Sequence, residues 1–242
     1  MPNFVMCLAD IPIQVNCLFD STEIYCKDFV CDIDPVYDIS ISERDILFER
    51  NMDALDVSDQ YLETLAVFRK IAELLIDDDI ILFHSSVIEL DGYAYVFGAP
   101  SGTGKSTHTG LWREYFKGRD VHMINDDKPL MKIDDQIEIY GTPWMGKERL
   151  GENRSAPVKA ICFLKQGKKN MIRRLDYNDA LTKVFRQTYR SSNRDKLEKT
   201  MKLLDELCQR IPVYEMDCTI SEDAVKLAYA YMKGETEDET EG

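Results

Sequence analysis

The stretch that most constrains this chain is 99–107, Ala-Pro-Ser-Gly-Thr-Gly-Lys-Ser-Thr, which lies between an apolar run, Tyr93–Phe97, and a helix-compatible run, Lys105–Phe116. Its glycines allow a tight turn in which successive backbone N–H groups face inward. The N-terminus of the following helix adds the positive end of the helix dipole. A glycine- and serine-rich surface loop that matched by chance would have no reason to follow a strand and to begin a helix. The stretch therefore predicts a protein that binds the phosphates of a nucleotide, although Ala99 stands where a glycine is more usual.

The residue types of this loop also predict what it binds. Lys105 is placed to reach the outer phosphates, and the hydroxyl of Ser106 can take a position next to Mg²⁺. The ligands expected here are therefore ATP and Mg²⁺. The predicted nucleotide-binding residues all belong to the loop: Ser101, Gly102, Thr103, Gly104, Lys105, Ser106 and Thr107.

Composition narrows the possible partners and the compartment. The 242 residues carry a formal net charge of −14, so neither nucleic acid nor an anionic membrane is an expected partner. The seven cysteines include no Cys-x-x-Cys pair, which favours reduced thiols over a disulfide framework or a zinc site. No signal peptide and no membrane-spanning run is visible, so a cytoplasmic location is expected.

The segment before the loop predicts how the sheet is built. Ile80–Leu90 is interpreted as one strand with His84 inside it, Asp91-Gly92 as a tight hairpin turn, and Tyr93–Phe97 as the returning strand. An antiparallel hairpin that leads into a phosphate loop indicates a mixed sheet rather than an all-parallel one. The fold class expected is α/β (α+β), with a mixed sheet at the nucleotide-binding core.

Beyond the loop helix, the short apolar strand Val121–Asn125 ends in Asp126 and Asp127. A carboxylate at the end of a strand beside a phosphate loop suits a Mg²⁺-nucleotide site. A turn that happens to hold two aspartates is the alternative. Coming soon after a complete loop, the pair is better interpreted as functional.

The segment 141–149 combines Gly, Pro and Trp144 with cations, and two interpretations fit it equally. It is either a loop on the rim of the site or a surface turn with Trp144 packed on the core. Lys147, Arg149 and Arg154 are candidates for holding transferred charge, because a guanidinium matches phosphate oxygens, although each of them alone is more typical of a surface cation.

Three parts of the chain differ in character. Residues 1–57 predict a small β-rich segment packed on the core, which leaves a homo-oligomer contact possible. Residues 58–233 form the main domain, with Ser58 as a helix cap at its start and a helical C-terminal part. Residues 234–242 are acidic and predict a disordered tail. The strands expected in the first part are Phe4–Leu8, Ile11–Phe19 and Ile39–Ile41.

His84, the hairpin, the loop 98–106 and the pair Asp126-Asp127 together resemble the catalytic core of the HPr kinase/phosphorylase family, which phosphoenolpyruvate carboxykinases share more distantly. The resemblance covers residues 80 to about 165 and suggests a small kinase-like relative rather than HPr kinase itself. It implies catalytic roles for Asp126, Asp127, His84 and Lys105, but it leaves open which aspartate is the base.

The segment 137–141, Ile-Glu-Ile-Tyr-Gly, resembles the family signature Ile-Glu-Ile-Arg-Gly, whose glutamate helps to hold the metal. Tyr140 stands where the family has arginine. The resemblance thus implies Ser106, Asp127 and Glu138 as metal ligands. The reverse, phosphorylase, reaction is not expected to carry over, because the departure at Tyr140 falls within the signature.

The function predicted on these grounds is a Mg-ATP-dependent kinase that phosphorylates a hydroxyl of a protein, a peptide or a small molecule. A regulatory or interaction protein that binds nucleotide without transferring phosphate is the alternative. A carboxykinase-type enzyme is less favoured, because the chain is short for that family's substrate domain.

Overall fold

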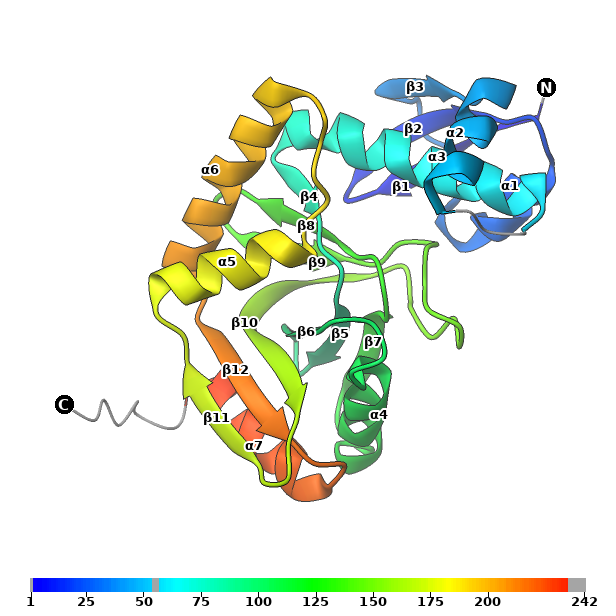
Figure 1. Ribbon diagram of the computed structural model, residues 1–242. Helices are drawn as coiled ribbons and strands as arrows, with labels where there is room; N and C mark the ends of the chain where they lie inside the picture. Colours follow the sequence, from blue (N-terminus) through cyan, green and yellow to red (C-terminus); the bar gives the residue numbers. More distant parts are fainter. Residues whose placement is uncertain (1, 54–56, 235–242) are drawn as a thin grey trace.

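The computed structural model describes residues 2–53 and 57–234, which form two lobes (Figure 1). The N-terminal lobe lies at the upper right of the figure, and the larger lobe contains the phosphate loop. The predicted tail falls outside the described residues except for Gly234. In the described ranges no helix is long and apolar enough to cross a membrane.

The N-terminal lobe is built on a three-stranded sheet in the order β1-β2-β3. The predicted strands are present as β1 (Asn3–Leu8), β2 (Ile11–Asn16) and β3 (Tyr37–Ser40). β1 and β2 pair antiparallel across a turn in which Ala9 and Asp10 have positive φ, whereas β2 and β3 run parallel. Ile11–Phe19 was expected to be extended throughout, but the strand stops at Asn16.

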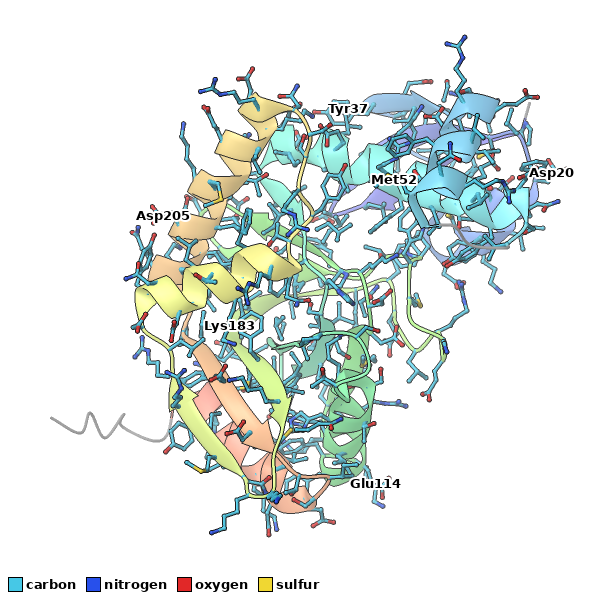
Figure 2. All side chains as sticks on the ribbon, in the orientation of Figure 1. Asp20, Tyr37, Met52, Glu114, Lys183 and Asp205 are labelled. Atoms are coloured by element: carbon cyan, nitrogen blue, oxygen red, sulfur yellow. The ribbon has the colours of Figure 1, made fainter. Side chains whose placement is uncertain are left out.

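Helical segments complete this lobe: α1 (Ser21–Tyr25), the 3₁₀ turn η1 (Lys27–Phe29) and α2 (Glu43–Asp53). Sequence reasoning did not predict α2, because its apolar residues do not form a clear helical stripe. Tyr37, labelled in Figure 2, donates a hydrogen bond to Asp78 and so ties β3 to the chain that enters the larger lobe.

The long helix α3 (Asp59–Leu74) begins where its cap was predicted, since the Ser58 hydroxyl accepts a hydrogen bond from the Tyr61 N–H. Its buried face packs in one cluster with the strands of the N-terminal sheet. Glu63 on this helix is fully buried, and its carboxylate accepts hydrogen bonds from the backbone N–H groups of Leu18 and Phe19. α3 is thus anchored to the N-terminal sheet, and the short turn η2 (Leu75–Asp78) follows it.

The larger lobe contains a nine-stranded sheet in the described part of the chain. Its main path runs β4-β8-β9-β10-β6-β5-β7, with β12 beside β10 and β11 beside β12. β10 pairs parallel with β6 and β12 but antiparallel with β9, so the predicted mixed sheet is confirmed. The strands are β4 (Ile80–Leu82), β5 (Ser86–Leu90), β6 (Tyr93–Gly98), β7 (Val121–Asn125), β8 (Leu130–Ile133), β9 (Ile137–Tyr140), β10 (Ser155–Gln166), β11 (Met171–Arg174) and β12 (Val213–Cys218).

Helices cover both faces of this sheet, which gives the α/β fold that the sequence predicted. α4 (Lys105–Tyr115) and α7 (Glu222–Lys233) share one apolar cluster with one face, around Trp112 and Phe97. α5 (Tyr177–Gln187) and α6 (Arg194–Arg210) pack on the opposite face with neighbouring residues such as Val96. Alternate residues of β6 therefore contribute to two separate cores, as the period of a buried strand requires.

One predicted strand is divided in two, and the division affects the site. Ile80–Leu90 was expected to be continuous, but β4 pairs with β8, while β5 pairs with β6 and β7. The chain therefore changes partners at residues 83–85, where the N–H groups of His84 and Ser85 donate to the carbonyls of Gln187 and Asp127. His84 thus lies in a break between strands and not inside one.

Candidate active site

The loop between β6 and α4 has the backbone that phosphate binding requires. Gly102 and Gly104 have φ values of +77° and +111°, which side chains with a Cβ rarely adopt. The Thr103 N–H donates to the Pro100 carbonyl, but within the described residues no hydrogen bond occupies the N–H groups of Gly102, Gly104 or Lys105. Both glycine N–H groups lie outside the helix, so the loop adds donors to those that any helix N-terminus leaves free.

Lys105 is held at the back of this loop. Its ammonium donates to the Ala99 carbonyl at 3.0 Å, and its Nζ lies 3.5 Å from Nε2 of His84. Burial lowers the pKa of Lys105, and the charge of Asp127 opposes that effect. The side chain thus presents its charge inside the cluster instead of extending into solvent.

His84 and Asp127 form a close pair. Their side chains meet at 2.9 Å between Nε2 and Oδ1, and both remain about one-third exposed, at 37% and 30%. Burial raises the pKa of Asp127, but the hydrogen bond and charge of His84, together with the charges of Lys128 and Lys105, outweigh it, so the net shift is downward. The carboxylate is therefore ionised at neutral pH and accessible, which a group that receives a proton must be.

Asn125 and Thr142 position this pair, and sequence reasoning missed both of them. The fully buried Asn125 accepts hydrogen bonds at Oδ1 from the N–H groups of Asp127 and Lys128. Its Nδ2 donates to the carbonyl and hydroxyl oxygens of Thr142. An Asn at a strand end followed by two aspartates is typical of an Asx turn, and this signal could have identified it.

Asp126 points elsewhere. It is buried, and its Oδ1 accepts a hydrogen bond of 2.6 Å from the Gly146 N–H. Burial raises its pKa, although the Gly146 hydrogen bond opposes that shift. A Cβ at Gly146 would lie 2.5 Å from Oδ2 of Asp126, so only glycine allows this approach. Asp126 thus fastens the 141–149 segment to the site, while Asp127 faces His84.

The two interpretations of the 141–149 segment can now be separated. Trp144 is buried, its indole N–H donates to the Thr64 carbonyl at 2.9 Å, and its ring lies 4.8 Å from that of Phe68. The tryptophan is therefore a packing residue against α3, in a segment that also borders Asp126. Arg149 stacks on Tyr25 in the N-terminal lobe.

Arg154 and Glu138 also form their ion pairs and hydrogen bonds with residues outside the phosphate loop. Arg154 forms ion pairs with Glu89 and Glu152. Glu138 accepts a hydrogen bond from the Tyr140 hydroxyl, which also bonds Asp10 of the N-terminal lobe. Within the described residues no contact joins Glu138 to the cluster of Lys105, His84 and Asp127, and no group of three His, Cys, Asp or Glu could by itself hold a metal ion.

Comparison with known proteins adds little to this geometry. No family model matches the chain, and no curated protein matches its sequence. Among solved structures, the HPr(Ser) kinase/phosphatase from Coxiella burnetii is 11% identical, with 62% of this chain and 93% of that chain covered and a TM-score of 0.34. So low a score shows neither the family nor the activity of this protein.

Proposed function

We propose that this protein is a Mg-ATP-dependent kinase that transfers the γ-phosphoryl group to a hydroxyl of a protein, a peptide or a small molecule. The observation that carries the proposal is the cluster of Lys105, His84 and Asp127 beside a phosphate loop. A protein that only binds nucleotide needs the loop, but it has no need of an accessible carboxylate paired with a histidine. The sequence resemblance to HPr kinase/phosphorylase supports the same reaction.

The residues present fit a metal-nucleotide ligand. Free N–H groups of the loop suit phosphate oxygens. The Ser106 hydroxyl stands at the first turn of α4, and Oδ2 of Asp127 has no hydrogen bond to the described residues. Mg²⁺ usually combines one or two protein oxygens with phosphate oxygens and water, so the Ser106 hydroxyl would hold the ion together with the nucleotide, Oδ2 of Asp127 would stay free to take a proton, and the bound ion would supply neutralisation of phosphate charge. Glu138 as a further ligand stays a prediction.

The chain's own residues then divide the reaction between them. Asp127 accepts the proton of the attacking hydroxyl as that oxygen bonds to the γ-phosphorus, and the bond to the bridging oxygen breaks so that ADP leaves. His84 orients the carboxylate through the 2.9 Å contact and holds it ionised. Lys105 stabilises the negative charge on the outer phosphates. Asp126 acts by holding the 141–149 segment in place.

Transfer of labelled phosphate from ATP to candidate acceptors tests this proposal. Asp127→Asn is expected to lower the transfer rate by about 10²–10⁴-fold, because a general base contributes that much. Lys105→Ala is expected to weaken nucleotide binding as well. Asp120→Asn is the matched control, because this aspartate pairs with His122 at the surface and is expected to leave transfer unchanged. Hydrolysis of ATP without transfer to any acceptor would contradict the proposal.

A second candidate function is supported by one specific observation. The 141–149 segment connects Asp126 at the site with α3 of the N-terminal lobe, through Gly146 and Trp144. Such a connection also suits a regulatory protein whose N-terminal lobe responds to bound nucleotide without any transfer. A nucleotide-dependent change in oligomer size with no labelled acceptor would favour this alternative.

A further inference from the structure

A cavity of about 520 Å³ lies directly beside the phosphate loop, on the side of α4 and of the C-terminal ends of β10 and β12. The loop contributes Gly102, Thr103 and Gly104 to its lining, and α4 contributes Thr107, His108 and Leu111. Gln166 lies at the end of β10, and Ile220 lies just after β12. Gly102, Thr103, Gly104 and Thr107 are also predicted nucleotide-binding residues, so the cavity directly adjoins the phosphate site, whereas the other lining residues were not predicted from the sequence. The volume is in the usual range for a small-molecule pocket.

His108 is the most informative residue of this lining, because it is polar and only 3% exposed. The indole N–H of Trp112 donates to its Nε2 at 3.0 Å, so Nε2 must be the unprotonated nitrogen. Burial lowers the pKa of His108 to about 4, and the ring is therefore neutral at physiological pH. The remaining proton must lie on Nδ1.

This Nδ1–H donor has no hydrogen-bond partner among the described residues. It is also not one of the fully enclosed polar atoms that lack a partner, and His108 lines the cavity, so the cavity is where a partner for this donor would fit. A buried donor without a partner is costly, and a ligand acceptor that paired with it would recover that cost. The cavity thus presents a fixed Nδ1–H donor near the apolar side chain of Leu111, in a wall that also includes the hydroxyl-bearing residues Thr107 and Thr219.

The other walls suit a flat ring. Ile220 is 80% exposed although it is large and apolar, and Leu111 on α4 lines the same cavity. The side-chain amide of Gln166 donates to the Thr103 carbonyl, which leaves its own oxygen as an acceptor and ties the β10 end to the loop. A donor from His108 and an acceptor from Gln166 match the edge of a nucleobase, and the apolar side chains of Leu111 and Ile220 suit its faces.

We infer that this cavity binds the nucleoside part of the nucleotide, with the base against Leu111 and Ile220 and an acceptor nitrogen or oxygen paired with His108. The inference rests on the proposed function, because the phosphates must occupy the adjacent loop. The protein would then prefer a nucleoside triphosphate over an equally charged inorganic chain.

The test compares the affinities of the full chain for MgATP and for magnesium tripolyphosphate by titration calorimetry. His108→Gln keeps an acceptor for Trp112 but removes the donor at the Nδ1 position. It is expected to weaken MgATP binding by about five- to tenfold and to leave tripolyphosphate binding unchanged, since one net hydrogen bond is lost. Circular dichroism would show that the variant is folded.

A second variant keeps the inference falsifiable if His108→Gln does not fold. Ile220→Ala removes an exposed side chain and is expected to weaken MgATP binding about threefold, again without an effect on tripolyphosphate. Ile24→Ala is the control, because Ile24 is also largely exposed, at 69%, but lies in the N-terminal lobe. Unchanged MgATP affinity in Ile220→Ala and in a folded His108→Gln would overturn the inference, whereas failure of the unmodified protein to bind either ligand would overturn the proposed function and the inference with it.

Discussion

At the scale of single residues, the identity of the candidate site residues follows from the sequence, but their contacts follow only from the fold. The loop residues, His84 and both aspartates can be found from sequence, because each belongs to a recognisable motif. The different partners of Asp126 and Asp127 cannot be predicted from the sequence, because adjacent side chains point in different directions and only the fold determines what each one contacts. Asp126 meets the backbone of Gly146, twenty positions away, and Asp127 meets His84.

The pairing of His84 with Asp127 predicts a shift in the pH dependence of transfer. The hydrogen bond and charge of His84 lower the pKa of Asp127, and burial raises it, so His84→Gln is expected to raise that pKa, although the charges of Lys105 and Lys128 still act downward. The carboxylate then becomes protonated, and inactive as a base, at a higher pH than in the unmodified protein. The acid limb of kcat/KM against pH is therefore expected to move upward.

The control for this experiment is His122→Gln, because His122 pairs with Asp120 and Glu152 at the surface, away from the loop. That variant is expected to leave the dependence of kcat/KM on pH unchanged. An unchanged acid limb in His84→Gln would show that the pair does not set the ionisation of the base.

At the scale of elements, apolar runs and turn residues predicted most strands and helices, including the hairpin at Asp91-Gly92, where both residues have positive φ. The break between β4 and β5 was not predicted, because the run from Ile80 to Leu90 is apolar throughout. Its division depends on which strands lie alongside, and that is tertiary information. His84 lies in this break and is about one-third exposed, so the error concerned a proposed catalytic residue.

The junction of β6 and α4 permits a comparison of two glycines only six positions apart. Gly104→Ala is expected to destabilise the fold by about 1–3 kcal/mol, because φ of +111° strains any residue with a Cβ. Gly110→Ala, on the exposed face of α4 with open space around it, is expected to stabilise the helix by about 1 kcal/mol.

Denaturant unfolding of both variants, together with MgATP titration, checks this prediction. Only Gly104→Ala should also weaken nucleotide binding, because only Gly104 shapes the phosphate loop. Similar stabilities for the two variants would contradict the loop conformation described above.

At the scale of the whole molecule, the sequence indicated two parts but not how they are joined. Ser58 was predicted to open the main domain, and the helix that it caps packs on the N-terminal sheet. The pattern of α3 shows one apolar face, but it does not say which sheet that face will meet. The joint includes Trp144, whose indole bonds α3, and the Tyr140 hydroxyl, which bonds Asp10.

This joint makes Trp144 the residue through which the N-terminal lobe should influence catalysis. Trp144→Ala removes a buried indole between α3 and the segment that Asp126 fastens, and it is expected to cost about 3–5 kcal/mol in the free energy of unfolding. Trp144→Phe keeps most of the packing and loses chiefly the hydrogen bond to Thr64, so it should cost about 1–2 kcal/mol.

Hydrogen exchange shows whether the effect of Trp144→Ala stays within α3 or also reaches the candidate site. In Trp144→Ala, faster exchange is expected in α3 and at the Gly146 amide, whose bond to Asp126 depends on the position of the segment. Transfer should fall with MgATP affinity little changed, because in the described residues no hydrogen bond or ring contact joins the phosphate loop to Trp144. Faster exchange confined to α3, with the Gly146 amide and the transfer rate unaffected, would show that the two lobes are joined without being coupled.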